Sequence, residues 1–191
     1  MYQKYHTDAL VLGSRETGES DRVLALYTRD FGLVRGKGTS LRATKSKMRY
    51  SLQNYSLAHV ALVKGRAGWR LAGAKAIGGA NEKNLKGISA FARISGLVMR
   101  FVAGEEAHER LFEILCEAHS ALMQDKSEAW PSIELICVAR IMHTLGYLSS
   151  EALQSAILTH TTYTEESLRE ADAMRDLLLR TINRAISETH L

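Results

Sequence analysis

Ten basic side chains lie between Phe31 and Asn81, and no Asp or Glu stands among them. A protein surface usually mixes both signs of charge, because a field of one sign repels itself. Each Lys or Arg near a phosphate releases condensed counterions, so such a run predicts a surface that binds a polyanion. The ten residues are Arg35, Lys37, Arg42, Lys45, Lys47, Arg49, Lys64, Arg66, Arg70 and Lys75.

Three aromatic side chains, Tyr50, Tyr55 and Trp69, are interleaved with these charges. Aromatic rings stack on unpaired bases in single-strand-binding proteins, at about 1–3 kcal/mol per base. We therefore count Trp69 among the candidate nucleic-acid-binding residues. Two alternatives stay open. The rings could belong to a hydrophobic core, which aromatic residues also dominate, and the basic run could be a solvated surface that favours solubility.

The two halves of the chain differ in charge. The chain has 191 residues and a net charge of +4, and 46% of its residues are hydrophobic, which is enough for a folded core. Residues 1–80 carry 14 basic and 5 acidic side chains, whereas residues 81–191 carry 11 basic and 16 acidic ones. We predict a basic nucleic-acid-binding domain over residues 1–79 and a mildly acidic domain over residues 80–191.

The first domain has the pattern of short β-strands, in which apolar runs are separated by turns rich in glycine and polar residues. Residues 39–50 are polar and basic, and we expect a long loop there. Five short strands with turns between them are typical of a small β-barrel. The expected strands are residues 8–13, 22–28, 33–38, 55–63 and 69–77.

The second domain has the pattern of amphipathic helices, since the apolar spacing changes from two to about 3.6 residues after Gly79. Pro131 is expected in the first turn of one helix, where proline is tolerated. Thr164 is expected to cap the last helix, which runs through Ala185. We therefore predict an α+β protein, a barrel followed by an all-α domain. The expected helices are residues 88–102, 111–122, 131–145 and 165–185.

No arrangement typical of a catalytic or metal site stands out. Cys116 and His119 share a helical face, but no second pair has the spacing of a structural zinc site. Glu19 and Asp21 are the acids that we consider for Mg²⁺ binding in a nuclease. Gly36-Lys37-Gly38-Thr39 lacks the upstream glycine of a phosphate-binding loop, so ATP hydrolysis is not expected. We predict a non-enzymatic protein without cofactor or metal.

The sequence also indicates a location. Cys116 and Cys137 are too few for a disulfide framework, and both lie in apolar helical stretches. The N-terminal residues have no apolar run typical of a signal peptide, and no segment reaches the roughly 18 apolar residues of a membrane span. We expect a cytoplasmic protein that associates with the nucleoid and not with a membrane.

Several short motifs follow one another along the chain. They are Asp8-Ala9-Leu10-Val11-Leu12, Gly18-Glu19-Ser20-Asp21-Arg22-Val23-Leu24, Tyr27-Thr28-Arg29-Asp30-Phe31-Gly32, Gly36-Lys37-Gly38, Ser46-Lys47, Leu52-Gln53-Asn54-Tyr55-Ser56-Leu57 and Leu145-Gly146-Tyr147-Leu148. In their order and spacing, these motifs resemble those of the bacterial recombination mediator RecO family. Most of them lie within residues 8–75, and the match in the C-terminal half is a helical pattern with one Leu-Gly-Tyr motif.

The resemblance implies an OB-fold barrel followed by a helical domain. It implies binding of single- and double-stranded DNA, annealing of complementary strands, and action with RecR to load RecA onto DNA coated by single-strand-binding protein. The helical domain of the family can also bind the acidic, apolar tail of that protein. Many relatives carry a cysteine-rich zinc-binding insertion after the Leu-Gly-Tyr helix, and this chain has no Cys between Tyr147 and Thr164.

Candidate partner surfaces lie in the second domain. Arg93, Arg100 and Arg140 stand on otherwise apolar helices and are candidates to receive an acidic peptide; arginines at the edge of a core are the alternative. Five acids near residue 109 could form a partner surface or could stabilise a helix start through the helix dipole. They are Glu105, Glu106, Glu109, Glu113 and Glu117.

We therefore predict a DNA repair protein of homologous recombination. The candidate DNA-binding residues are Arg35, Lys37, Arg42, Lys45, Lys47, Arg49, Lys64, Arg66, Trp69 and Arg70. The alternatives are an RNA-binding OB-fold protein such as an RNA chaperone, a metal-dependent nuclease, and an adaptor that binds only proteins.

Overall fold

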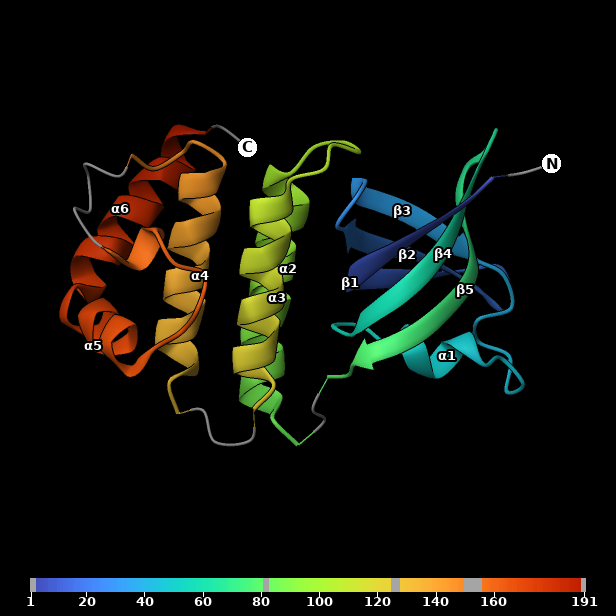
Figure 1. Cartoon of the computed structure of the whole chain (residues 1–191), viewed down its shortest axis with the longest axis horizontal. Helices are drawn as coiled ribbons and strands as arrows, with labels where there is room; N and C mark the ends of the chain where they lie inside the picture. The colour runs from blue at the N-terminus through green and yellow to red at the C-terminus, as the bar shows by residue number, and fades with distance from the viewer. Residues whose placement is uncertain (1–2, 81–82, 125–127, 150–155, 190–191) are drawn as a thin grey trace. The chain divides into compact units, whose positions relative to one another are not determined.

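Five strands close into a barrel in the order β1-β2-β3-β5-β4 (Figure 1). All neighbours are antiparallel except β3 and β5, which run parallel. The predicted class, α+β with an N-terminal five-stranded OB-type barrel followed by helices, is confirmed. The strands are β1 (Lys4–Thr17), β2 (Asp21–Thr28), β3 (Gly32–Gly38), β4 (Leu57–Gly65) and β5 (Gly68–Gly78).

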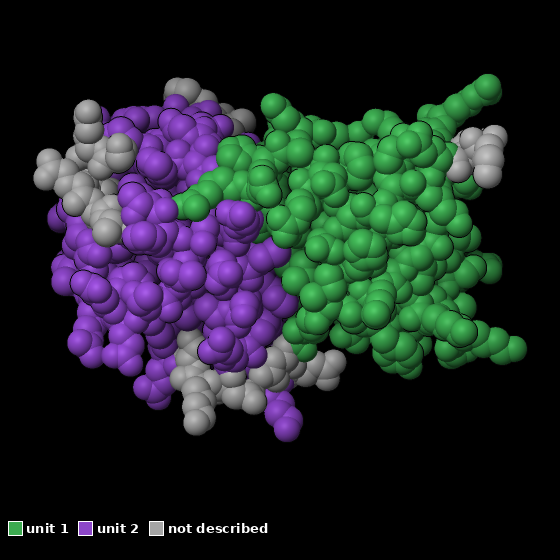
Figure 2. All heavy atoms as spheres, in the orientation of Figure 1, with its two compact units in different colours: residues 1–80, 102–112 green, residues 81–101, 113–191 purple. Residues whose placement is uncertain are grey.

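This computed structural model describes residues 3–80, 83–124, 128–149 and 156–189. The chain divides into two compact units (Figure 2), residues 1–80 with 102–112 and residues 81–101 with 113–191. The division at residue 80 that the sequence suggests stays a prediction, and the first unit here also takes in residues 102–112.

Strand β1 is longer than predicted and has two partners. It pairs with β4 over Lys4–Leu10 and with β2 over Ala9–Thr17, and its register shifts between Val11 and Gly13. A bulge of this kind bends a strand, which lets one strand serve two neighbours in a closed barrel. Residues 14–17 lie outside the predicted strand 8–13 but continue β1, because their backbone pairs with β2 while their polar side chains suit its outer face.

Alternate residues of the strands fill the barrel. Leu41, from the segment 39–50 expected to be a polar loop, and Leu52, just after that segment, are also buried in this core. That segment contains one helical turn, α1 (Met48–Ser51), so its few apolar residues pack inward while its charges stay in solvent. The buried core residues are Ala9, Val11, Leu24, Leu26, Val34, Leu41, Leu52, Ala58, Val60, Leu62, Trp69 and Leu71.

The second unit is helical, as predicted. A core of buried residues joins α2, α4, α5 and α6, and the edge of the Phe91 ring meets His119, which brings α2 and α3 side by side (Figure 1). The described helices are α2 (Leu85–Phe101), α3 (Glu109–Leu122), α4 (Trp130–Thr144), the 3-10 turn η2 (Ala156–Leu158), α5 (Glu165–Ala173) and α6 (Arg175–Glu188). Not one of these helices combines the length and the apolar character needed to cross a membrane.

The predicted last helix is two helices, which is a correction. Thr164 caps α5 as expected, since its hydroxyl accepts a hydrogen bond from the Ser167 N–H at 3.1 Å. The helix is interrupted at Met174, whose backbone (φ −100°, ψ 10°) is not helical. The apolar positions Ala171 and Leu178 on either side belong to the same core, and the change of direction keeps both of them packed.

Two glycines with positive φ give a test of the packing around the barrel. Gly32 (φ +61°) would place a Cβ 2.1 Å from the Glu106 carbonyl oxygen, whereas Gly18 (φ +59°) has nothing within 4 Å. We expect Gly18→Ala to lower the free energy of unfolding by about 1–2 kcal/mol from backbone strain alone. Gly32→Ala should cost about 2 kcal/mol more because of the added clash. Urea unfolding followed by tryptophan fluorescence measures both, and equal losses would contradict the packing of residue 106 on Gly32.

Candidate nucleic-acid interface

The basic side chains predicted to bind DNA all lie on the surface of the first unit. The alternating strands turn their small and apolar residues inward, so the cations between them point outward. The exposed residues of this set are Arg35, Lys37, Arg42, Lys45, Lys47, Arg49, Lys64, Arg66 and Arg70.

Part of this set belongs to a row that crosses four neighbouring strands, β1, β2, β3 and β5. Lys37 on β3 is directly opposite Arg70 on β5 and opposite Val23 on β2, which is in turn opposite Arg15 on β1. Side chains of directly opposite residues share one face of a sheet, so Arg15, Lys37 and Arg70 point to the same side. Arg35, two residues before Lys37, shares that face. Arg15 was not predicted from the sequence, because it precedes the acid-free run.

A polar groove of about 560 Å³ lies where the 39–56 segment meets β1 and β2. Three arginines reach it, Arg22 from β2 and Arg42 and Arg49 from the segment between β3 and β4. Arginine presents a planar fork of donors that suits phosphate oxygens. The remaining lining residues are Ser14, Glu16, Leu41 and Asn54.

The arginines of the groove are held by neighbouring oxygens. Arg22 donates to Asn54 Oδ1 at 3.2 Å and contacts the Ser14 hydroxyl, which itself donates to Asn54 Oδ1 at 2.7 Å. Arg42 Nη1 lies 3.0 Å from Glu16 Oε2 and donates to the Glu19 carbonyl at 3.3 Å. Arg22 was not predicted, because in the sequence it stands outside the basic run, beside Asp21.

Asp21 holds the backbone at Ser40, where the chain leaves β3, and the side chain of Lys37. Its carboxylate accepts a hydrogen bond from the Ser40 N–H at 2.9 Å and pairs with Lys37 Nζ at 3.0 Å, and both contacts lower the Asp21 pKa, the Ser40 N–H most. Ser40 has a positive φ of 53°, so this bond secures an unusual backbone conformation. Among the residues that the structure describes, no three Asp, Glu, His or Cys side chains gather closely enough to hold a metal ion.

Trp69 lies in the barrel core rather than on the surface. Only 5% of it is exposed, and its ring centroid lies 5.6 Å from that of Tyr5 and 5.2 Å from that of Phe31. The geometry favours the core alternative, so Trp69 is left out of the proposed DNA-binding surface. Lys64 lies over this ring at 5.1 Å and is held by Glu105 at 2.7 Å.

Arg140 is the one candidate of the partner-binding set that is buried. It is 1% exposed and donates to the carbonyls of Ile157 (2.7 Å), Thr161 (2.6 Å) and Thr162 (3.0 Å). Its guanidinium also lies 4.8 Å from the Tyr163 ring centroid. Arg140 therefore secures the chain before α5 and is left out of the proposed partner surface.

The other two arginines of that set are exposed. Arg93 forms a two-pronged ion pair with Glu134, both bonds at 2.6 Å, and this hydrogen bonding raises the Arg93 pKa. Arg100 lies 5.7 Å from the ring centroid of Phe101. The predicted set is therefore not brought together at one site.

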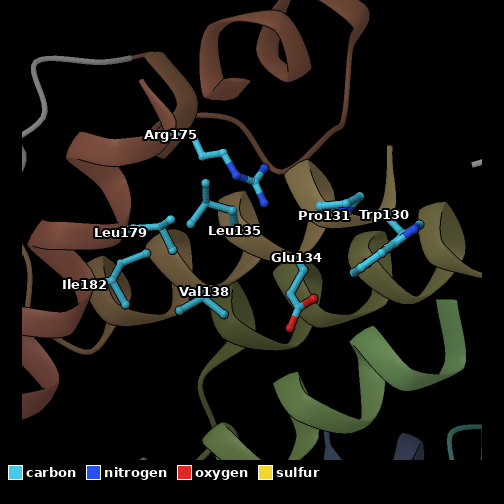
Figure 3. A pocket seen from close by; sticks show the side chains of 8 residues that line it. All are labelled: Trp130, Pro131, Glu134, Leu135, Val138, Arg175, Leu179 and Ile182. Carbon is cyan, nitrogen blue, oxygen red and sulfur yellow. The ribbon is translucent and has the colours of Figure 1, made fainter. Parts of the chain in front are cut away.

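An apolar pocket of about 340 Å³ lies between α4 and α6 (Figure 3). Leu179 is 40% exposed at this pocket, and Figure 3 shows the Arg175 guanidinium pointing from α6 toward α4. The pocket thus combines an apolar floor with a cation. The lining residues are Trp130, Pro131, Glu134, Leu135, Val138, Arg175, Leu179 and Ile182.

That the zinc-binding insertion is missing between Tyr147 and Thr164 stays a prediction. Residues 150–155 of this stretch lie outside the described residues. The sequence of the stretch contains no Cys, so cysteine ligands are not available there.

Comparison with known proteins points to one family. Residues 1–79 match the family model described as "Recombination protein O N terminal". Similar curated proteins are named DNA repair protein RecO. The protein of this name from Desulfitobacterium hafniense is 43% identical over 63 residues, which cover 33% of this chain and 23% of that protein. The protein of this name from Dehalococcoides mccartyi is 32% identical over 113 residues, which cover 58% of this chain and 45% of that protein.

A longer match is found with the protein of the same name from Syntrophobacter fumaroxidans. It is 31% identical over 147 residues, 74% of this chain and 57% of that protein. The matched regions thus amount to between 23% and 57% of the length of these relatives.

The burial of Arg140 leads to a stability prediction. Arg140→Met would leave three backbone carbonyls without donors, so we expect a loss of about 3 kcal/mol or more in the free energy of unfolding. Arg100→Met removes the same charge from an exposed position and should change it by about 0.5 kcal/mol or less. Urea unfolding of both variants measures the difference. A stable Arg140→Met protein would return Arg140 to the candidate partner surface.

Proposed function

The chain belongs to the RecO family, and we propose that it is a DNA repair protein of homologous recombination that binds DNA and anneals complementary strands. The observation that carries this proposal is the convergence of Arg22, Arg42 and Arg49 on one polar groove of the barrel. The row of Arg15, Lys37 and Arg70 on the outer face of neighbouring strands extends the positive surface.

Such a surface favours annealing for a simple electrostatic reason. Two DNA strands repel each other through their phosphates, and cations of a protein that contacts both strands lower this repulsion. Contacts to phosphates carry no sequence information, so one surface suits single- and double-stranded DNA of any sequence. The groove arginines would fix the position of a backbone, and the exposed Lys45 and Lys47 would add charge near it.

The family resemblance extends the proposal to partners. We propose that the protein acts with RecR to load RecA onto DNA coated by single-strand-binding protein, in the cytoplasm and at the nucleoid. In this role it works by binding alone, without catalysis, cofactor or metal. The division of labour would follow the predicted domains, with DNA on residues 1–79 and protein partners on residues 80–191.

We propose that the pocket between α4 and α6 receives the acidic, apolar tail of single-strand-binding protein. Its apolar floor suits the apolar residues of the tail, and Arg175 suits a carboxylate of the tail. Glu134 lines the same pocket, but its charge is balanced by Arg93. Arg93, which the sequence suggested as a partner contact, would thus act by neutralising Glu134.

The DNA-binding proposal is tested with a triple variant of the groove. We expect Arg22→Ala/Arg42→Ala/Arg49→Ala to weaken DNA binding and to reduce the slope of log K against log salt by roughly 2–3, because three phosphate contacts are lost. The control, Arg169→Ala/Arg180→Ala/Arg184→Ala on the exposed sides of α5 and α6, has the same change in net charge. Fluorescence anisotropy with a labelled oligonucleotide across a salt series measures both slopes.

The same two variants separate the proposed activity from its alternatives. Annealing of strands precoated with single-strand-binding protein should be accelerated by the wild type and the control, and not by the groove variant. Equal slopes for the two variants would contradict the groove as the site. Preferential RNA binding would favour an RNA chaperone. Mg²⁺-dependent cleavage lost in Asp21→Ala would favour a nuclease. Complete absence of salt-dependent binding would favour a protein adaptor.

The pocket is tested with a peptide of acidic residues that ends in apolar ones. We expect Arg175→Ala to weaken peptide binding about tenfold, since a hydrogen bond to a charged group contributes about 1.5 kcal/mol or more. Arg169→Ala removes an equal charge from an exposed position of α5 and should have little effect. Fluorescence anisotropy of the labelled peptide gives the dissociation constant for each variant. Equal dissociation constants for the two variants would exclude Arg175 as a contact.

A further inference from the structure

An acidic segment of the chain lies on the barrel. Residues 102–112 belong to the same compact unit as the strands, and they contain Glu105, Glu106 and Glu109. Of these acids only Glu109 is in the first turn of α3, so the expectation that all of them stabilise a helix start is too simple. Two of the three form ion pairs with basic residues of the barrel.

Glu105 binds a residue of the predicted DNA-binding set. Its Oε2 lies 2.7 Å from Lys64 Nζ, and this hydrogen bond lowers the Glu105 pKa. Both side chains remain accessible, with 56% of Lys64 and 43% of Glu105 exposed. The carboxylate therefore stays charged at neutral pH and neutralises a cation that DNA could also reach.

Glu109 holds a second cation. Its Oε1 lies 3.7 Å from Arg29 Nη1, and the Arg29 guanidinium lies 4.6 Å from the Phe112 ring centroid. Glu109 is 76% exposed and Arg29 is 42% exposed. The pair is again open to solvent and to a competing anion.

The segment is anchored by contacts other than these ion pairs. Phe112 is 1% exposed, and its ring stacks on Tyr27 at 6.5 Å between centroids. The backbone of Glu106 lies against Gly32, so closely that a Cβ there would clash with its carbonyl oxygen. The carboxylates are thus held beside the barrel cations whether or not the ion pairs form.

We propose that Glu105 and Glu109 are built-in competitors of DNA phosphates for Lys64 and Arg29, so that the acidic segment limits the affinity of the protein for DNA. This inference rests on the proposed DNA-binding function. It adds Arg29 to the DNA contacts and assigns residues 102–112 a regulatory role.

The competition has a distinctive effect on salt dependence. While Lys64 stays paired with Glu105, it makes no phosphate contact and releases no condensed cation from DNA. Lys64 therefore contributes little to the salt slope while Glu105 is present. Weak affinity is favourable for a protein that must leave the strands after they have annealed.

The test compares Glu105→Gln with Glu106→Gln. Both variants remove one negative charge from neighbouring exposed residues, and Glu106 has no ion pair with any residue that the structure describes. We expect Glu105→Gln to bind a labelled oligonucleotide several-fold more tightly than Glu106→Gln. Its slope of log K against log salt should also be steeper by roughly 0.7–0.9, the contribution of one phosphate contact.

A double variant makes the result specific to the pair. In the Lys64→Ala background, Glu105→Gln and Glu106→Gln should be indistinguishable in affinity and slope, because there is no cation left to free. Exposed ion pairs contribute little to stability, so all variants should keep the circular dichroism spectrum of the wild type. Equal slopes for the two single variants would overturn the inference while wild-type binding upheld the proposed function. Loss of salt-dependent binding in the wild type itself would overturn both.

Discussion

The bulge between Val11 and Gly13 lets β1 pair with both β2 and β4, and the closed barrel depends on this double pairing. Closure removes the free strand edges and gives every strand an inside and an outside. The inside is filled by small and branched residues and by Trp69, and Leu41 and Leu52 complete it from outside the strands. The lysines and arginines of the strands are consequently all directed outward, which is the condition for any binding of phosphates.

The basic surface carries less net positive charge in the folded protein than the acid-free run suggests. Acids from other segments pair with its cations: Asp21 with Lys37, Glu16 with Arg42 and Glu105 with Lys64. A count along a window of sequence therefore overstates the positive field. In the groove, Glu16 balances the charge of Arg42, and the charges of Arg22 and Arg49 remain. This moderate excess of positive charge suits reversible binding.

The fold class could be predicted because apolar residues recur at a spacing of two before Gly79 and of about 3.6 after it. The ends of elements were harder, because backbone pairing extends β1 through polar residues and the shared core divides the last helix at Met174. The site was predicted only in part. Arg15 and Arg22 precede the acid-free run and stand beside acids in the sequence, and only strand register brings them to the same surface. The residues around Arg140 in the sequence do not tell a buried arginine from an exposed one.

Burial is what separates the structural cations of this protein from those available to a ligand. Arg140 is enclosed and satisfied by three backbone carbonyls, so its donors cannot be exchanged for a phosphate without opening the domain. Lys64 is 56% exposed and bonded to one exposed carboxylate, so an incoming phosphate can replace that partner without any change of fold. The same charge is therefore fixed in one place and exchangeable in the other. A reversible DNA-binding surface requires the exchangeable kind, and the barrel presents it along β3, β5 and the groove.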